Sequence, residues 1–180
     1  MLFLKSAPRV ERILVSDSIF HKVAEMRYRV YCEELGFLEK DKYPKKLETD
    51  EYDGDSIHVA VLIGRRLAGY ARVILPREGT LPIFEHFSVP AELNIDQACE
   101  VSRFMISKLY RKKTETRREI FRLLAEEILK VVEEQKVKSI YAVVEDWLLK
   151  SLHKRGYKFE MIGEGKDYMG AITYPTRLRI

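Results

Sequence analysis

The sequence predicts a mixed α/β fold, with helices packed on a sheet in a single domain spanning residues 1–180. Short runs rich in β-branched residues alternate with segments whose apolar residues recur every three or four positions, a pattern typical of α/β domains. Apolar residues make up 46% and charged residues 33% of the chain, as in ordinary globular proteins. No apolar run approaches the length of a membrane span, and no repeat or Gly/Ser linker divides the chain.

The N-terminal region is expected to form a short strand followed by a helix. Residues 10–15 are mainly apolar, and residues 16–18 supply N-cap side chains for a helix that runs to about Leu35. Arg27 lies at the three- and four-residue spacing of the apolar face of that helix. A cation at such a position either extends to water or meets an acidic partner, and the sequence leaves both open.

A hairpin is expected next, with strands at residues 57–63 and 67–75 joined at residues 64–66. Arg72 lies inside the second of these strands. Residues 36–56, between the helix and the hairpin, mix aromatic and charged side chains without a sustained period. Loops of that length in a compact domain are usually functional or disordered, and the aromatic residues favour an ordered one.

The second half is expected to alternate strands and helices, at residues 99–107, 117–135, 139–144, 146–153 and 170–174. The helix at 117–135 has the most regular apolar face, and the one at 146–153 ends before Gly156, a typical C-terminal stop. Residues 76–98 are irregular and contain Phe84 and Phe87. These apolar side chains either line a pocket or cover the core.

Two charged residues, Glu100 and Arg103, occupy a strand whose other positions are core-like. A buried ion pair is a poor source of stability, so this arrangement favours a functional site. On a straight strand the even-numbered residues from Glu100 to Ile106 share one face and the odd-numbered ones share the other, and a bulge would change that assignment. Glu100 in an apolar cleft would have a raised pKa and could accept a proton from an attacking amine; alternatively it anchors an arginine.

The acidic stretch at residues 48–53 offers acceptors to a cationic substrate or to the internal arginines. Asp50 and Asp53 are three residues apart, and Glu48 precedes them. The stretch fails as an EF-hand, because Ala60 occupies the position of the bidentate glutamate when Gly54 is taken as the turn glycine. The four histidines lack ligand spacing, so we predict no metal site.

Other chemistries find little support. Ser102 lies in no Gly-x-Ser-x-Gly motif, and Cys32 and Cys99 form no recognised nucleophile signature. The chain has no Gly-x-Gly-x-x-Gly run and no Walker motif, so nucleotide hydrolysis and dinucleotide redox chemistry are not expected. The apolar start, residues 1–4, is too short for a signal peptide, and two distant cysteines suit reduced thiols, so a cytoplasmic protein is favoured.

A basic segment extends from Lys108 to Arg122, with seven basic residues and two acidic ones, in a chain of formal net charge +4. Such a patch suits an acidic partner, which could be a nucleic acid, a phosphorylated cofactor or an acidic carrier protein. The alternative is a solvated helix face with no partner.

Several of these elements, in this order, resemble the acyl-homoserine-lactone (autoinducer) synthases. The resemblance is carried by five runs: Met26-Arg27-Tyr28-Arg29-Val30-Tyr31, Gly36-Phe37, Glu48-x-Asp50-x-x-Asp53, Gly69-Tyr70-Ala71-Arg72-Val73 and Glu100-Val101-Ser102-Arg103-Phe104. The second half is similar to that of the GNAT acyltransferase fold, to which these synthases belong. The resemblance therefore implies a GNAT-like fold with a central, mostly antiparallel sheet splayed into a V and flanked by helices.

The resemblance also implies roles for individual residues. Glu100 would be the base, acting through water, with Ser102 and Arg103 beside it on the catalytic strand. The amine substrate would be bound by Arg27, Tyr31, Phe37, Asp50, Asp53 and Arg72. The acyl chain would contact Phe84, Phe87, Phe104 and Met105. Backbone amides of residues 104–107 would stabilise the oxyanion. A carrier protein would dock on Lys108, Arg111, Lys112, Lys113, Arg117 and Arg118.

Two positions differ from the autoinducer synthases, and they bear on the acceptor. Phe37 stands where those synthases carry a tryptophan, and Cys99 stands where an aromatic residue is usual. Residues 106–113 are more similar to the relatives that make N-acyl amino acids or accompany exosortase systems. The loop at residues 111–118 lacks the glycines of an ordinary GNAT pyrophosphate loop, which favours a carrier protein over coenzyme A as donor.

We therefore expect an N-acyltransferase that moves a fatty acyl group from an acyl thioester to the amine of a small amino-acid-like acceptor. The thioester, of acyl carrier protein or of coenzyme A, would be a co-substrate, with no permanently bound cofactor. One alternative is an S-adenosylmethionine-dependent acyl-homoserine-lactone synthase that serves quorum sensing. Another is a non-catalytic module that binds nucleic acid or a carrier protein through the basic segment.

Overall fold

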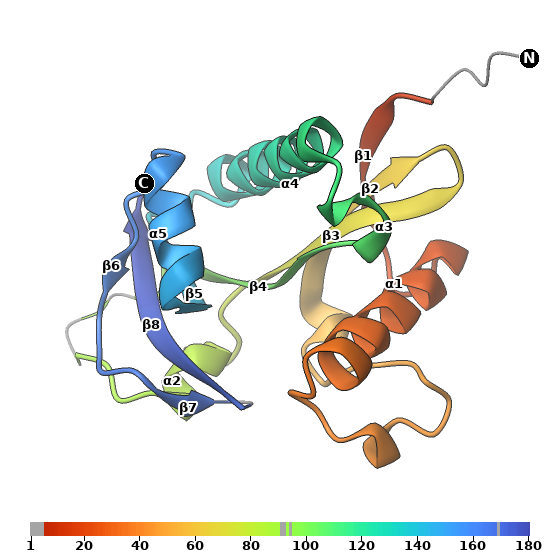
Figure 1. Cartoon of the computed structure of the whole chain (residues 1–180). Coiled ribbons are helices and arrows are strands. Elements are labelled where there is room, and N and C mark those ends of the chain that lie inside the picture. Colours follow the sequence, from red (N-terminus) through yellow and green to blue (C-terminus); the bar gives the residue numbers. More distant parts are fainter. Residues whose placement is uncertain (1–5, 91–92, 94, 169) are drawn as a thin grey trace, which may run out of the picture.

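The computed structural model describes residues 6–90, 93, 95–168 and 170–180, which build one sheet with helices on both faces (Figure 1). The strands have the spatial order β1-β2-β3-β4-β5-β8-β6, and β7 pairs with β8 outside this path. Every pair of neighbouring strands is antiparallel except β4 and β5. The mixed α/β fold expected from the sequence is confirmed, with a mostly antiparallel sheet.

The N-terminal strands are β1 (Pro8–Ile13), β2 (Ser56–Ile63), β3 (Arg66–Ile74) and β4 (Ala98–Ile106). The C-terminal strands are β5 (Ser139–Glu145), β6 (Glu160–Met161), β7 (Lys166–Tyr168) and β8 (Ala171–Arg179). The expected hairpin is β2–β3, turning at Gly64, whose φ of 62° suits glycine. The other expected strands also form, with ends shifted by one or two residues, except that β8 runs five residues past the expected end at 174. The short strands β6 and β7 were not expected.

The α-helices are α1 (Ser18–Tyr28), α2 (Pro82–His86), α3 (Lys108–Arg111), α4 (Thr114–Glu134) and α5 (Asp146–Lys154). Shorter turns are η1 (Arg29–Glu34), η2 (Lys40–Lys42) and η3 (Asp53–Asp55). The first helix runs as far as predicted, but its last part, η1, is a π-helix. Among the described residues, no helix has the length and apolar character needed to cross a membrane.

The two faces of the sheet bury separate cores. On one face α4 and α5 cover a core that includes Val59, Val73, Ile120 and Ile140. α4 packs closely on β3 at Gly69. A side chain would not fit there, since an added Cβ would lie only 2.5 Å from Ile120 Cγ2 on α4. On the other face, α1 and α2 cover two smaller clusters, and between these clusters lie the charged residues described below.

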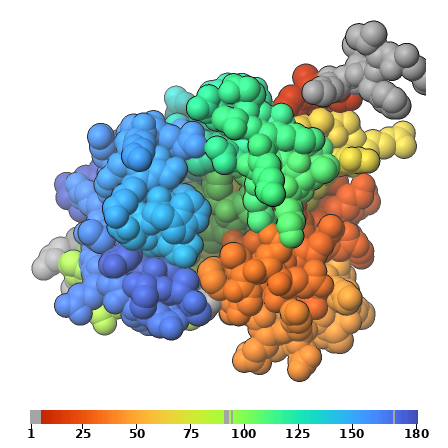
Figure 2. Space-filling model, in the orientation of Figure 1, coloured from red at the N-terminus to blue at the C-terminus, as the bar shows by residue number. Residues whose placement is uncertain are grey.

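The strands β4 and β5 diverge after a short parallel contact. Their pairing covers Ala98–Glu100 with Ser139–Tyr141, and the register contains no β4–β5 pair beyond Glu100. The two halves of the sheet separate from there (Figure 1). In the space-filling view a furrow runs between the blue C-terminal segments and the orange segment that follows α1 (Figure 2). This is the V-shaped splay that the sequence led us to expect.

A β-bulge in β4 changes which side chains share a face. Arg72 pairs with Ser102 and Tyr70 pairs with Met105, so residues 103 and 104 together oppose Ala71. Arg103 sits at the bulge with a φ of 52°, in the left-handed region that non-glycine residues rarely adopt. The straight-strand assignment is therefore wrong beyond Ser102.

As a result, Met105 joins the face of Glu100 and Ser102, while Phe104 packs into the opposite core below α4.

Candidate active site

Three arginines and three carboxylates from separate segments meet under the sheet. Arg27 comes from α1, Arg72 from β3 and Arg103 from the bulge in β4. The carboxylates come from the loop before β2, namely Glu48, Asp50 and Asp53. Arg27 and Glu48 are 0% exposed, and Arg72 is 2% exposed. The cluster contains equal numbers of opposite charges, so each buried ion has a partner.

Arg27 lies at the centre of the cluster and contacts all three carboxylates. Its guanidinium forms a bidentate pair with Glu48, through Nε and through Nη2 at 2.9 Å. Nη1 donates to Asp53 Oδ1 at 2.6 Å, and Nη2 approaches Asp50 Oδ2 at 3.4 Å. Of the two outcomes that the sequence left open for Arg27, the acidic partner is the one observed.

Arg72 and Arg103 close the cluster from the two strands. Arg72 Nη1 donates to Asp50 and to Asp53 Oδ1, the latter at 2.7 Å. Arg103 donates to Glu48 at 3.0 and 3.2 Å and to Asp50 at 3.2 Å, and its guanidinium lies 4.9 Å from the centre of the Tyr31 ring. The positive φ at the bulge brings the Arg103 side chain to the same side as Arg72.

The arginines keep Glu48 and Asp50 ionised. Burial by itself would raise the pKa of Glu48, but hydrogen bonds from Arg27 and the nearby charge of Arg103 lower that pKa below its ordinary value. Burial acts on Asp50 in the same way, and the hydrogen bond and charge of Arg72 lower its pKa. Glu48 and Asp50 are therefore ionised partners of the arginines at neutral pH, and neither is placed to act as an acid or a base.

Glu100 lies on the same face of β4 but has a different environment. Its Oε2 accepts a hydrogen bond from the backbone N–H of Ile83 at 2.7 Å, and the residue is 6% exposed. Across the sheet its neighbours are Ile74 on β3 and Tyr141 on β5. Burial raises the pKa of Glu100 to about 7, against the opposing effect of the Ile83 N–H.

This separation decides between the two sequence interpretations of Glu100. Its recorded hydrogen bond goes to a backbone amide, and it makes no ion pair with an arginine among the described residues. Glu100 is thus not the anchor of Arg103, a role that Glu48 and Asp50 fill. A carboxyl group whose pKa lies near neutrality is suited to accept a proton at physiological pH.

Ser102 binds an arginine in this site. Its Oγ accepts a hydrogen bond from Arg72 Nε at 3.0 Å. Tyr31 and Phe37 lie on the wall formed by η1 and the following loop, with ring centres 6.4 Å apart. The backbone N–H of Phe37 donates to the carbonyl of Tyr31 at 2.8 Å, which fixes the start of that loop. The structure thus gathers Ser102, Tyr31 and the paired charges in one region.

A buried histidine and tyrosine hold Asp53 in place, and the sequence analysis did not identify either of them as part of the site. His58 Nε2 lies 2.8 Å from the carbonyl oxygen of Asp53, and Nδ1 lies 2.7 Å from the Tyr70 hydroxyl. Burial lowers the pKa of His58, so the ring is neutral. Since a carbonyl only accepts, Nε2 carries the proton and Nδ1 accepts from Tyr70. Alternation in β2 and β3 could have placed this pair on the face of Arg72.

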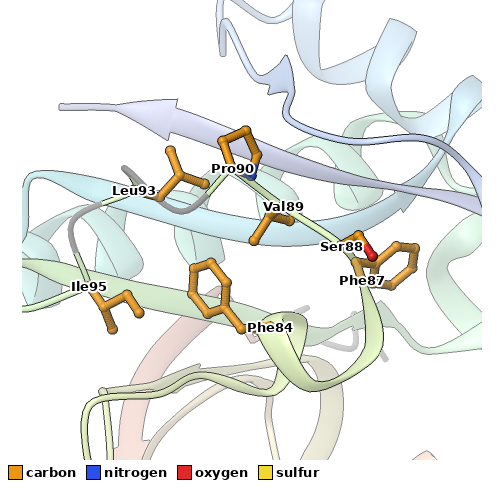
Figure 3. A pocket seen from close by; sticks show the side chains of 7 residues that line it. All are labelled: Phe84, Phe87, Ser88, Val89, Pro90, Leu93 and Ile95. Atoms are coloured by element: carbon orange, nitrogen blue, oxygen red, sulfur yellow. The ribbon is translucent and has the colours of Figure 1, made fainter.

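The four residues expected to form one acyl pocket lie in three different places. Phe84 and Phe87 line a cavity of about 460 Å³ together with Ser88, Val89, Pro90, Leu93 and Ile95 (Figure 3). Met105 packs against α1, and Phe104 packs on the opposite face against Phe121. The bulge turns Phe104 to the face opposite Met105, and the cavity lies beside α2, so the structure does not bring these four residues together; their contact with an acyl chain stays a prediction.

The residues of the basic segment fall into two groups, arginines bonded within the protein and lysines without an ion pair to a described residue. Arg111 is partly buried and bonded internally, to the carbonyl of Ile106 at 2.6 Å and to Glu34 at 2.5 Å. Arg118 pairs with Glu115 at 3.1 Å, and Arg117 donates to the carbonyl of Arg111 at 3.2 Å. The lysines at 108, 112 and 113 are exposed and have no ion pair with any described residue, whereas Arg117 and Arg118 are exposed but bonded within the segment.

The role of Glu48 also escaped the sequence analysis. Glu48, seen there only as an extra acceptor, is fully buried and binds both Arg27 and Arg103. Three arginines on core-facing positions need three acids, so charge balance would have indicated it. Within residues 6–90, 93, 95–168 and 170–180, no group of side chains is arranged to hold a metal ion.

Solved structures with this fold include several acyltransferases. The CoA-dependent acyl-homoserine lactone synthase BjaI, with SAM and isopentyl-CoA, has a TM-score of 0.79 at 20% identity, covering 97% of this chain and 84% of BjaI. TofI, in a ternary complex with an inhibitor and MTA, has a TM-score of 0.75 at 18% identity, covering 96% and 90%. An acyl-CoA N-acyltransferase from Pseudomonas aeruginosa reaches 0.64 at 14% identity, covering 96% and 99%.

At these identities the likeness establishes a shared fold. No curated protein sequence gave a significant match. A family model described as an acetyltransferase (GNAT) domain matches residues 26–119, more than half of the chain and the part that carries all three cluster arginines and Glu100. The chain therefore belongs to the GNAT acetyltransferase family and is an acyltransferase.

Proposed function

We propose that the protein transfers a fatty acyl group from an acyl thioester to the primary amine of a small amino-acid-like acceptor. The observation that carries this proposal is the position of Glu100, a nearly unpaired buried carboxyl group whose pKa is raised to about 7. An ammonium group has no lone pair, so it must lose a proton before it attacks a thioester. Glu100 would accept that proton through one water molecule.

The acyl thioester would lie in the slot where β4 and β5 diverge. Phe104 on β4, Phe121 on α4 and Tyr157 after α5 form a row of partly buried rings on the α4 side, with centres 5.1 and 6.2 Å apart. This row offers apolar contact to an acyl chain. In the reaction the amine nitrogen bonds to the carbonyl carbon, the carbon–sulfur bond breaks, and the thiolate leaves and is protonated.

The oxyanion would be stabilised at the bulge. Residues 103 and 104 face a single residue of β3, so the bulge takes backbone N–H groups out of the regular ladder. Ser107, at the other end of the expected range, donates its N–H to the carbonyl of Ala68 at 2.9 Å. We therefore narrow the oxyanion site to the amides next to Arg103.

The acyl donor would be a thioester of an acyl carrier protein in preference to one of coenzyme A. The exposed lysines 108, 112 and 113 follow directly after β4, at the open end of the slot. Lysines that form no ion pair with a described residue suit the acidic surface of a carrier protein, or the phosphate of its pantetheine arm. Both the acyl carrier protein thioester and the coenzyme A thioester should therefore be tested as donors with the purified protein.

The experiment is a product search. Purified protein is incubated with octanoyl, dodecanoyl and hexadecanoyl thioesters of acyl carrier protein and of coenzyme A. The acceptors are the common amino acids and S-adenosylmethionine. Mass spectrometry of the amines, with thiol release as the rate, should reveal an N-acyl product whose rate rises with pH up to about 7. A lactone product would identify the S-adenosylmethionine reaction, and no product with any pair would sink the proposal.

A further inference from the structure

Glu100 is held by α2, a helix too short to fix its own position. α2 has five residues, Pro82–His86, and an isolated helix of that length is unstable in water. Its second residue, Ile83, donates its backbone N–H to Glu100 Oε2 at 2.7 Å. Leu81 and Ile83 are 0% and 1% exposed, so apolar burial keeps the helix against the sheet. Burial has no preferred direction, so the angle at which Ile83 faces Glu100 depends on directional contacts elsewhere on α2.

A hydrogen bond between Tyr52 and Glu85 is such a directional contact. The Tyr52 hydroxyl donates to Glu85 Oε2 at 2.9 Å. Glu85 lies two residues after Ile83 on α2, and Tyr52 lies in the loop before β2, 33 residues earlier in the chain. The bond therefore joins the helix that holds Glu100 to the loop that carries the carboxylates of the charged cluster.

Tyr52 is itself fixed to the charged cluster. Its backbone N–H donates to Asp50 Oδ1 at 3.1 Å, and the Arg72 guanidinium lies 5.9 Å from the centre of its ring. Burial and the hydrogen bond to Glu85 raise the pKa of Tyr52, so its hydroxyl keeps its proton and remains a donor at neutral pH. A continuous set of contacts thus leads from Asp50 through Tyr52 and α2 to Glu100.

The Tyr52–Glu85 bond lies beside space that the protein does not fill. Tyr52 and Glu85 line a cavity of about 270 Å³, and its wall also includes Ile74, the β3 neighbour of Glu100. Atoms that line such a space lack protein contacts on one side, which leaves α2 room to shift. Without the bond, the Ile83 N–H would be free to move away from Glu100.

From these contacts we propose that Tyr52 and Glu85 are positioning residues for the base. Their hydrogen bond holds α2 so that the Ile83 N–H stays on Glu100, and it keeps the Glu100 carboxyl aligned with the charged cluster. The inference rests on the proposed role of Glu100 in acyl transfer, and it adds two residues that act on Glu100 through α2.

Glu85 also acts on Glu100 through its charge. The groups that face Glu100 are charged or titratable and come from several elements: Arg72 on β3, Arg103 on β4, Tyr141 on β5, Tyr168 on β7, Tyr52 before η3 and Glu85 on α2. Glu85 is the one carboxylate among them. Burial raises the pKa of Glu100 most, the Ile83 N–H lowers it, and the Glu85 charge raises it further. The hydrogen bond and the charge of Glu85 thus act in opposite directions, so two variants can separate them.

Tyr52→Phe removes the hydroxyl and keeps the ring. Exchange of the Ile83 amide hydrogen, followed by NMR, should become about 5-fold faster, the usual worth of one net hydrogen bond. The acid limb of the pH profile of kcat/KM should move up by about 0.5 to 1 pH unit, because Glu100 holds its proton more tightly without the Ile83 N–H. Tyr43→Phe, on a partly buried tyrosine directly after η2, is the matched control and should change neither measurement.

Glu85→Gln keeps an oxygen that accepts the Tyr52 hydroxyl but removes the charge. Ile83 exchange should stay within about twofold of the parent. The acid limb should move down by about 0.3 pH unit at low salt, and this shift should shrink at about 0.5 M salt because Glu85 is exposed. Glu78→Gln, exposed on the wall of the same cavity, makes the same change of charge and should leave the acid limb in place.

Glu85→Ala removes the hydrogen bond from its exposed partner. It should reproduce the faster Ile83 exchange of Tyr52→Phe, and it replaces that variant in the test if Tyr52→Phe does not fold.

Opposite movements of the acid limb in Tyr52→Phe and Glu85→Gln, with faster Ile83 exchange in Tyr52→Phe alone, support the inference. Unchanged exchange and an unchanged acid limb in Tyr52→Phe overturn it and leave acyl transfer by way of Glu100 standing. A lower rate in both variants with no movement of the acid limb also overturns it, because that pattern reports a general loss of structure. If the parent transfers no acyl group, the proposed function fails, and Ile83 exchange alone decides whether Tyr52 and Glu85 hold α2: faster exchange in Tyr52→Phe supports this, and unchanged exchange overturns it.

Discussion

Glu48 and Glu100 are both buried glutamates below the same sheet, yet their environments give them opposite properties. Glu48 is bound by Arg27 and Arg103, and its pKa is lowered. Glu100 accepts one backbone hydrogen bond at a site flanked by Ile74 and Tyr141, and its pKa is raised to about 7. Burial penalises both ionised groups, so the number of cationic partners makes the difference.

The comparison teaches how this site can separate support from chemistry. Three arginines matched by three carboxylates form a buried network of ion pairs that supports the site. Glu100 lies on the same strand as Arg103 but has no arginine partner among the described residues. Its pKa therefore lies near neutrality, which suits a group that accepts a proton in catalysis.

Replacing the isolated carboxyl should have the largest effect. Glu100→Gln keeps the shape and can still accept the Ile83 N–H, but it loses the ability to take a proton. The rate of acyl transfer at pH 7.5 should fall about 10²–10⁴-fold, the usual contribution of a positioned base. Glu133→Gln, on an exposed residue of α4, serves as the control. A Glu100→Gln enzyme within threefold of the parent would show that Glu100 is not the base.

Replacing a paired carboxyl should instead affect folding. Glu48→Gln leaves Arg27 and Arg103 buried with one fewer counter-charge, and breaking such a pair costs about 3–5 kcal/mol. Urea unfolding at pH 7.5 measures this loss, with Glu51→Gln, in the same loop but exposed, as the matched control. A loss below about 1 kcal/mol would mean that Asp50 and Asp53 alone neutralise the arginines, and would weaken the contrast.

The sequence predicted the features of this site that depend on neighbouring residues in the chain, and it missed those that depend on the register between strands. The position of Arg27 on an apolar helix face and the spacing of Asp50 and Asp53 were visible as patterns, and their convergence followed the predicted sheet. The bulge was not visible, because Arg103 adopts a positive φ without the glycine that usually marks one. That bulge depends on the register with β3, and it sends Phe104 and Met105 to opposite faces.

The cavity and the role of Ile83 were hidden for a related reason. Residues 76–98 have no period, so the sequence left open whether Phe84 and Phe87 line a pocket or cover the core. α2 forms there because Pro82 begins it at N1 or N2, and its position against Glu100 depends on a backbone N–H that any residue could supply. Contacts made by the backbone leave no signal in side-chain patterns.

A smaller effect should separate the two glutamates by pH. The pKa of Glu100 is raised from 4.5 to about 7, so the folded state holds a proton that the unfolded state has already lost between these values. Its contribution to stability is complete below about pH 4.5 and is lost as the pH rises through about 7. Glu100→Gln should therefore be more stable than the parent at pH 8.5, by on the order of 3 kcal/mol, and equal to it at pH 4.

Thermal or urea unfolding at both pH values measures this difference. A parent protein whose stability relative to Glu100→Gln does not change between pH 4 and 8.5 would show that the carboxyl has an ordinary pKa. In that case the contrast with Glu48 would concern geometry alone.

The smallest effect concerns basic side chains, which also differ between the buried cluster and the surface. The cluster arginines are neutralised, whereas Lys112 and Lys113 are exposed, and no ion pair with a described residue occupies them. Replacing both lysines by glutamate should raise KM for acyl carrier protein thioesters by about 10-fold at low salt and leave kcat unchanged, because rim charges act mainly on association. The difference from the parent should shrink at 0.5 M salt as the charges are screened. Lys40→Glu/Lys45→Glu, a pair of exposed lysines in the loop after η1, is the charge-matched control. If both double variants raise KM equally, net charge rather than a docking surface after β4 governs the encounter.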